Sequence, residues 1–172
     1  AFSLVGTDEA SNAPRAGVPF SRVREAVRTL QRVRKAKMGV HLELHFAYLM
    51  LASQMEAVEG LPDLMDELDV HAAVISTLDY IAAPGLEAEA FSPHEAGKLD
   101  AARDILERVA EETAKRGRGL YYSLPSPRPD DGCGLFPCRE NAARTLYVDA
   151  EGRMSPCIYL NLPVDAPASS PE

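Results

Sequence analysis

Apolar residues recur with a helical period in three stretches of the chain. The first runs from Phe20 until Gly39 ends the pattern, with apolar positions returning at steps of three and four residues. A shorter stretch follows Gly60 and has proline in its first turn. The last begins with the capping box SPHE at 92–95 and ends near Gly117. Each of these stretches predicts an amphipathic helix.

Three other segments have the pattern of β-strands. Residues 2–5 are short and apolar, and residues 72–78 form a β-branched run typical of a strand buried on both faces. Residues 40–50 alternate with a period of two. The alternating side chains are Leu42, Leu44 and Phe46 on one side and His41, Glu43 and His45 on the other. Strands that alternate with helices predict an α/β fold with right-handed parallel crossovers, as in a barrel or an open sheet. Three strands cannot close a barrel.

The pattern changes near residue 118, where we place a domain boundary. Proline is dense between 125 and 137, and the strand-like residues 145–149 then turn through Ala150, Glu151 and Gly152. Gly152 stands where a three-residue hairpin loop needs a left-handed residue. The sequence therefore predicts an α/β domain at 1–118, a small β-hairpin domain at 119–163 and a disordered tail, rich in proline and serine, at 164–172.

Composition narrows the classes of partner. The chain has 172 residues and 46% apolar side chains, enough to bury a core, and its net charge of −8 argues against nucleic acid as the main partner. We expect the one basic cluster, residues 22–37, to be the solvated face of a helix. The sequence shows neither a membrane-length apolar run nor a signal peptide, so we expect no membrane partner. An odd number of unevenly spaced cysteines favours a cytoplasmic protein. Because the chain begins at Ala1 directly in a strand-like segment, we expect it to be a piece of a longer protein.

Three cysteines, Cys133, Cys138 and Cys157, carry the candidate chemistry. An odd number is a poor disulfide framework, and in a reducing compartment cysteines more often bind metal or react. The predicted hairpin would bring Cys138 and Cys157 close together. Thiolates suit zinc or an iron–sulfur cluster, but no Cys-x-x-Cys or paired Cys/His zinc spacing is present. The alternative is that all three are ordinary buried or loop thiols.

The spacing around these cysteines resembles a known family. Thirteen residues separate Cys138 from Gly152 and four separate Gly152 from Cys157, and residues 146–163 read LYVDAEGRMSPCIYLNLP. This segment resembles the start of the SPASM or twitch extension of radical S-adenosylmethionine (radical SAM) enzymes. FSLVGTDEASNAPRAG is similar to the end of the fourth barrel strand and the following loop of that family. The resemblance extends to about residue 163. It implies half of an incomplete (β/α) barrel followed by an auxiliary 4Fe-4S cluster. Cys138 and Cys157 would be among the ligands, and Cys133 an alternative ligand or a bystander.

The resemblance also implies roles for other residues. Ser3 on the fourth barrel strand and Arg15 in the following loop would lie near S-adenosylmethionine, with Arg15 paired to the methionyl carboxylate. The alternative is that Arg15 is a surface arginine. Leu78 would pack on the adenine, or belong to the core. Glu43 and His45 would line the barrel interior and contact cofactor or substrate, or be polar residues left exposed by the missing half. Histidines four apart on a strand lie about 13 Å apart, too far to share one metal ion.

The sequence also departs from the family. The three-cysteine motif that holds the S-adenosylmethionine-cleaving cluster is absent, so this chain cannot by itself generate the deoxyadenosyl radical. The intact parent enzyme would modify a peptide or protein side chain, with the auxiliary cluster relaying an electron or binding substrate. One alternative is a non-catalytic iron–sulfur module, for electron transfer or peptide binding, that works with a separate catalytic half. Another is a structural fragment with free thiols. We expect the exposed strand edge to make the isolated chain associate.

Overall fold

A computed structural model describes most of the chain. The described ranges are 1–15, 17–37, 42–78, 85–125 and 146–155. The chain divides into two compact units, Ala1–Arg128 and Pro129–Glu172, and each is described by itself below. Several predictions fall outside the described residues: those for His41, Cys133, Cys138, Cys157 and the tail at 164–172.

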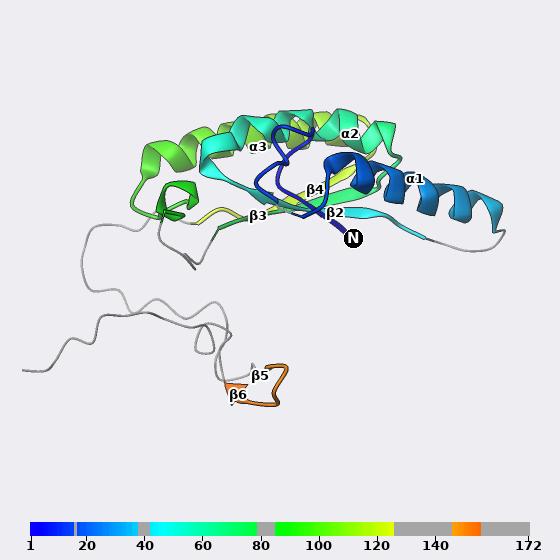
Figure 1. The fold of residues 1–172 in the computed structure, drawn as a ribbon. Coiled ribbons are helices and arrows are strands. Elements are labelled where there is room, and N and C mark those ends of the chain that lie inside the picture. Colours follow the sequence, from blue (N-terminus) through cyan, green and yellow to red (C-terminus); the bar gives the residue numbers. More distant parts are fainter. Residues whose placement is uncertain (16, 38–41, 79–84, 126–145, 156–172) are drawn as a thin grey trace, which may run out of the picture. The chain divides into compact units, whose positions relative to one another are not determined.

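The first unit is built on a parallel sheet, as the α/β prediction required (Figure 1). Its strands are β1 (Phe2–Leu4), β2 (His45–Met50), β3 (Ala72–Thr77) and β4 (Gly119–Tyr122), and they lie side by side in chain order. The sequence did not predict β4, which follows the boundary placed near 118 and adds a fourth strand to the sheet. GLYY is too short to show a period of two, and none of its residues is fully buried.

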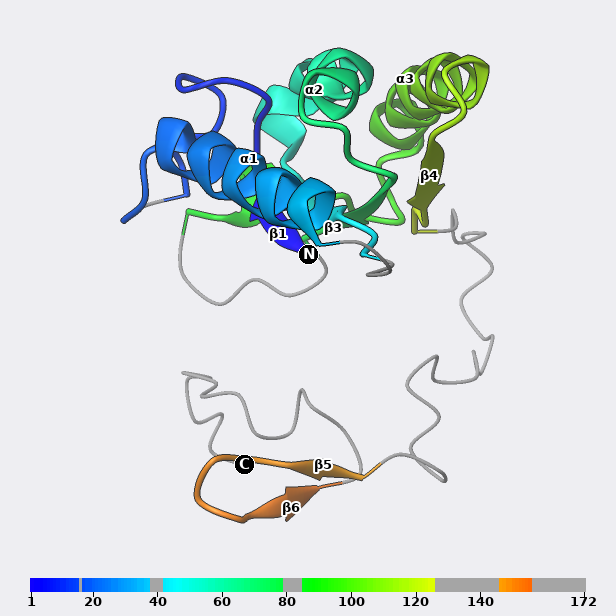
Figure 2. The same cartoon turned by 90° about the vertical axis from the view of Figure 1, so that its right-hand side faces the viewer.

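Helices follow the first three strands and lie on one side of the sheet (Figure 2). They are α1 (Phe20–Ala36), α2 (Leu61–Glu67) and α3 (Ala96–Lys115), with short 3₁₀ segments at Ala52–Gly60 and Glu87–Glu89. Each predicted helix is confirmed. However, α3 begins after the expected capping box, because Ser92 Oγ accepts a hydrogen bond from the N–H of His94 and residues 92–95 form a turn. No helix in the described ranges is both long and apolar enough to cross a membrane.

The hydrophobic core lies between the sheet and the helix layer. Leu4, Phe46, Tyr48, Met50 and Ile75 of the strands are almost completely buried. They belong to the same cluster of buried side chains as residues from every helix, namely Val27, Leu61, Met65, Leu99 and Leu106. Burying this many large apolar side chains is the main source of stability of the unit.

The other face of the sheet carries a different set of residues. Along β3, Ala73, Ile75 and Thr77 are buried, but Val74 is 49% exposed and Ser76 is exposed. The prediction that this strand is buried on both faces is therefore wrong. Its composition suits two-sided burial, but helices in the described part of the unit cover only one side.

The second unit contains a short antiparallel hairpin. β5 (Tyr147–Val148) pairs with β6 (Met154–Ser155), and Gly152 has a φ of +82° in the turn between them. The predicted left-handed position of Gly152 is thus confirmed. Asp149 stabilises the turn, since its carboxylate accepts hydrogen bonds from the backbone N–H groups of Glu151 and Arg153.

Two valines on α1 test which side of that helix carries the core. Val27 is fully buried, whereas Val33 is 44% exposed. We expect Val27→Ala to lower the free energy of unfolding by roughly 1–3 kcal/mol, because it removes buried methyl groups and leaves a cavity. The matched change Val33→Ala should lower it by less than about 0.5 kcal/mol. Urea unfolding of both variants measures the difference, and equal losses would contradict the placement of α1.

Candidate functional site

The helix-free face of the sheet is the first candidate surface. The strand register places Ser3, Ala47, Val74 and Tyr121 in one row across the four strands. All four are exposed, Tyr121 by 63%. We call this row and its surroundings the uncovered face. Since three of the four side chains are small, a ligand could approach the backbone of the sheet closely here.

Ser3 and Arg15, which the resemblance assigned to one site, lie in contact on this face. The guanidinium Nη1 of Arg15 donates a hydrogen bond to Ser3 Oγ at 2.5 Å. Within the described part of the chain, Arg15 forms no ion pair with a carboxylate. A planar guanidinium has several N–H donors and suits a carboxylate.

The loop that carries Arg15 is held by its own polar side chains. Glu9 caps α1, because its carboxylate oxygens accept hydrogen bonds from the backbone N–H groups of Phe20 and Ser21, each at 3.1 Å. Asp8 and Ser11 close a turn within the loop. The hydrogen bond from the Ser11 backbone N–H, followed by that from its hydroxyl, lowers the pKa of Asp8. The loop is thus fixed to the start of α1 without help from a ligand.

Glu43 and His45 contact each other, with His45 Nε2 and Glu43 Oε2 3.3 Å apart. His45 lies at the amino end of β2, on the same face of the strand as Ala47. Parallel sheets bind ligands at the carboxyl ends of their strands, and the loop with Arg15 leaves β1 at that end. Glu43 and His45 therefore lie at the opposite end of the sheet from this loop. A role of this pair in binding cofactor or substrate stays a prediction.

Leu78 directly follows β3 and is half-buried. This position is at the carboxyl end of the sheet, the end from which the loop with Arg15 also leaves. A contact with adenine is not tested by the structure and stays a prediction.

The proposed cluster ligands Cys133, Cys138 and Cys157 lie outside the described residues. In the ranges that the structure does describe, no group of three or more His, Cys, Asp or Glu side chains could hold a metal ion. The hairpin that was predicted to bring Cys138 and Cys157 together is present, and Cys157 follows β6 by two positions. Their ligation of one cluster stays a prediction.

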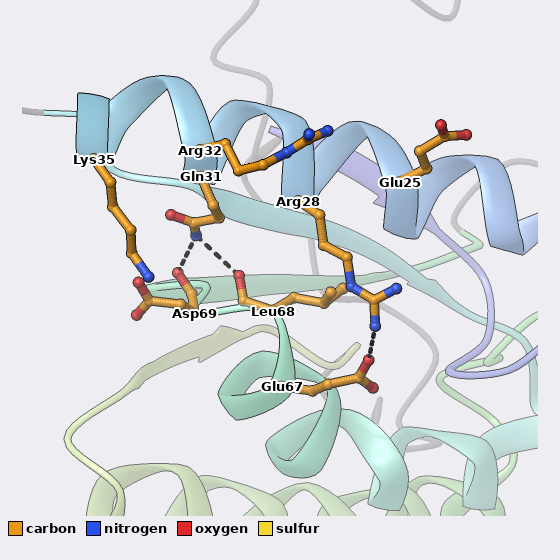
Figure 3. Close-up of a pocket in the computed structure, with 8 residues that line it drawn as sticks. All are labelled: Glu25, Arg28, Gln31, Arg32, Lys35, Glu67, Leu68 and Asp69. Atoms are coloured by element: carbon orange, nitrogen blue, oxygen red, sulfur yellow. Dashed lines mark hydrogen bonds and ion pairs between the residues drawn. The ribbon is translucent and has the colours of Figure 1, made fainter. Parts of the chain in front are cut away.

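Sequence reasoning missed a groove of about 510 Å³ between α1 and the turn that joins α2 to β3 (Figure 3). Its lining residues are Glu25, Arg28, Gln31, Arg32, Lys35, Glu67, Leu68 and Asp69. Gln31 is buried at its base, where Nε2 donates to the backbone carbonyls of Leu68 and Asp69 at 2.9 and 2.6 Å. A glutamine used in this way joins α1 to the turn.

Several charged side chains around this groove form ion pairs. Glu67 accepts hydrogen bonds from Arg24 and Arg28, and Asp69 pairs with Arg34 and Arg118. The basic cluster at 22–37 is therefore only in part a solvated face, which corrects that prediction. The sequence held no local signal for these pairs, because the carboxylates lie 35 or more positions away from the α1 arginines. The contacts around the groove join α1 to the end of α2 and to the turn after it.

The ion pairs of Glu67 predict a pH dependence of stability. The hydrogen bond from Arg24, with the charges of Arg24 and Arg28, lowers the pKa of Glu67 from its ordinary value of 4.5. A carboxylate with a lowered pKa stabilises the fold above 4.5, and this contribution is lost as the pH falls through the folded pKa. Both partners are part-exposed, so we expect Glu67→Gln to cost less than about 1 kcal/mol at pH 7 and progressively less as the pH falls toward about 3.

Urea unfolding of the wild type and Glu67→Gln at both pH values measures this contribution. Glu25→Gln is the control, since Glu25 lines the same groove but pairs with no guanidinium among the described residues. A Glu67→Gln deficit that stayed the same in acid would show that the ion pairs are not its cause.

Comparison with known proteins identifies no relative: no protein-family model, no curated protein and no solved structure matches this chain.

Proposed function

We propose that the chain is part of a radical S-adenosylmethionine enzyme that modifies a peptide or protein. Its first unit would be half of an incomplete (β/α) barrel, and its second the start of an auxiliary-cluster domain. The observation that carries the proposal is the contact of Arg15 with Ser3 on the uncovered face. The two residues that the resemblance places beside the methionyl group lie 12 positions apart in sequence, yet they touch.

The arrangement of strands supports the barrel interpretation. In a (β/α) barrel, parallel strands follow one another in chain order, the helices form an outer layer, and side chains fill the inner face. The first unit has parallel strands in chain order and its helices on one side. A doubly wound open sheet would instead have helices on both faces.

Exposed apolar side chains on α1 also favour a barrel. Leu30 is 39% and Val33 44% exposed, and both lie on the side of α1 opposite to Arg24 and Arg28, which contact α2. The same end of the unit has β1 as the edge strand of the sheet. A further strand and helix beside β1 and α1 would cover these side chains and pair the edge.

The residues on the uncovered face would bind and orient S-adenosylmethionine. Arg15 would bind the methionyl carboxylate through the N–H groups that Ser3 does not use, and its hydrogen bond to Ser3 Oγ would hold the guanidinium beside β1. The Ser3 hydroxyl keeps its own proton as a second donor. The small side chains Ala47 and Ser76 leave room above the strands.

The cysteines would hold the auxiliary cluster. Thiolates are the usual ligands of iron–sulfur clusters, and a 4Fe-4S cluster takes about four of them. Cys138, Cys157 and Cys133 supply at most three, so a further ligand would come from substrate, another residue or another chain. The bound cluster would supply electron transfer or a binding site for substrate.

A second candidate function rests on the same three cysteines, Cys133, Cys138 and Cys157. The chain would then be a non-catalytic iron–sulfur module whose catalytic half is encoded separately. An upstream reading frame with three clustered cysteines would favour a split or truncated enzyme.

Anaerobic reconstitution with iron and sulfide tests the cluster that both candidate functions share. We expect the reduced chain to bind iron and to gain absorbance in the thiolate-to-iron charge-transfer region. Cys138→Ala and Cys157→Ala should each lose most of the iron and the absorbance. The same measurement on Cys133→Ala assigns this residue as a ligand or a bystander.

Thermal unfolding of each variant serves as the control, since a variant that loses iron but keeps its fold has lost a ligand. A wild-type chain that bound no iron with its thiols reduced would contradict the proposed cluster and favour the free-thiol alternative.

A further inference from the structure

Asn12 links the end of β1 to Arg15. It lies in the loop after β1 and is only 2% exposed. Its Oδ1 accepts a hydrogen bond from the backbone N–H of Val5 at 3.0 Å, and its backbone carbonyl accepts one from the N–H of Arg15 at 3.0 Å. Arg15 then donates to Ser3. A closed path of hydrogen bonds thus runs from the strand end through Asn12 and Arg15 back to the strand.

The buried amide of Asn12 is costly in itself. Its Nδ2 is buried without a hydrogen-bond partner in the described part of the chain. A buried donor without a partner costs free energy that an apolar side chain of the same size would not. In return, Asn12 provides a hydrogen-bond acceptor for the backbone N–H of Val5. Val5 is also buried and directly follows the last residue of β1.

The backbone at Gly6 lets the loop come this close to the strand. A Cβ at Gly6 would lie 2.1 Å from the carbonyl carbon of Ser11 and 2.4 Å from the backbone nitrogen of Asn12. Any side chain at this position would push the loop away from the end of β1. The missing side chain of Gly6 therefore permits the close approach, and the hydrogen bond that Asn12 Oδ1 accepts holds the loop there.

Other hydrogen bonds of the loop act elsewhere. Thr7 Oγ1 donates to the carbonyl of Ala57, Ser11 closes a turn with Asp8, and Glu9 caps α1. Apart from the bond of Arg15 to Ser3, the side-chain hydrogen bond of Asn12 ties the segment before Arg15 to the end of the strand that carries Ser3.

We propose that Asn12 is a positioning residue that holds the guanidinium of Arg15 against Ser3 on the uncovered face. The inference deepens the proposed function, on which it rests only for the identity of the ligand. An arginine fixed before the ligand arrives loses less conformational entropy when it binds a carboxylate.

The guanidinium N–H resonance of Arg15 in the full chain, assigned by its loss in Arg15→Lys, tests this role. We expect Asn12→Leu to speed its exchange with solvent about tenfold, the factor that the loss of one ordinary hydrogen bond gives. Asn12→Asp should leave the exchange slow, because it keeps the acceptor for Val5. Its buried carboxylate should nevertheless lower the unfolding temperature. Asn12→Ala replaces Asn12→Leu if the leucine variant does not fold.

Leu99→Ala is the control for stability, since Leu99 is a fully buried residue of α3. This variant should unfold more easily and yet keep the slow exchange at Arg15. Slow exchange in Asn12→Leu, or fast exchange in Leu99→Ala or Asn12→Asp, would overturn the role of Asn12. The same resonance is then followed while S-adenosylmethionine is added. If Asn12 behaves as expected and the ligand leaves the wild-type signal unchanged, the positioning role stands and the proposed ligand is wrong.

Discussion

Burial of one face of a parallel sheet is the constraint on which the rest of this structure depends. Apolar side chains of the strands form one core with residues of α1, α2 and α3, and the exposed row of Ser3, Ala47, Val74 and Tyr121 does not belong to it. The strands are therefore free to carry serine, alanine and valine on the uncovered face without loss of core volume. This division separates the residues that stabilise the unit from those that could bind a ligand.

Ion pairs and hydrogen bonds then hold α1 in a position that apolar packing alone does not specify. Carboxylates near the end of α2 pair with arginines of α1 and with Arg118, which directly precedes β4. Asp69 contacts both Arg34 and Arg118. Asp69 has a φ of +49°, a conformation that aspartate tolerates better than most residues, and it ends the α2 turn while its carboxylate faces Arg34 and Arg118. Such part-exposed pairs add little free energy singly. Together with the buried amide of Gln31 they fix the direction in which α1 crosses the sheet.

Local sequence signals predicted the parts of the fold that depend on local periodicity. The start of α1 follows from the apolar repeat that begins at Phe20, and the left-handed Gly152 follows from hairpin geometry. Whether another element covers a face of a strand depends on residues far away in the sequence. For this reason the β-branched run in β3 was wrongly expected to be buried on both faces. The strand β4 was missed because four residues, GLYY, carry no period.

Some candidate site residues were likewise predicted from the sequence, and others were not. The neighbourhood of Ser3 and Arg15 was expected from a resemblance and is present in the structure. Asn12 was not singled out, because its partner Val5 lies seven positions away and only the folded loop brings them together. An asparagine that follows a glycine-containing strand end could have suggested such a contact, since asparagine often bonds to nearby backbone. Nothing in the sequence indicated the groove at Glu67, whose ion pairs join distant segments.

Adjacent positions on β3 give the most direct test that the sheet has one covered and one uncovered face. In a variant with alanine at the three native cysteines, Val74→Cys and Ile75→Cys are each reacted with a thiol reagent under native conditions. Val74 is 49% exposed and Ile75 only 3%. We expect Val74→Cys to react within about tenfold of the unfolded rate, and Ile75→Cys to be protected by more than about a hundredfold. Equally strong protection at both positions would show that the face with Ser3 and Arg15 is covered, and would contradict its proposed role as the ligand-binding surface.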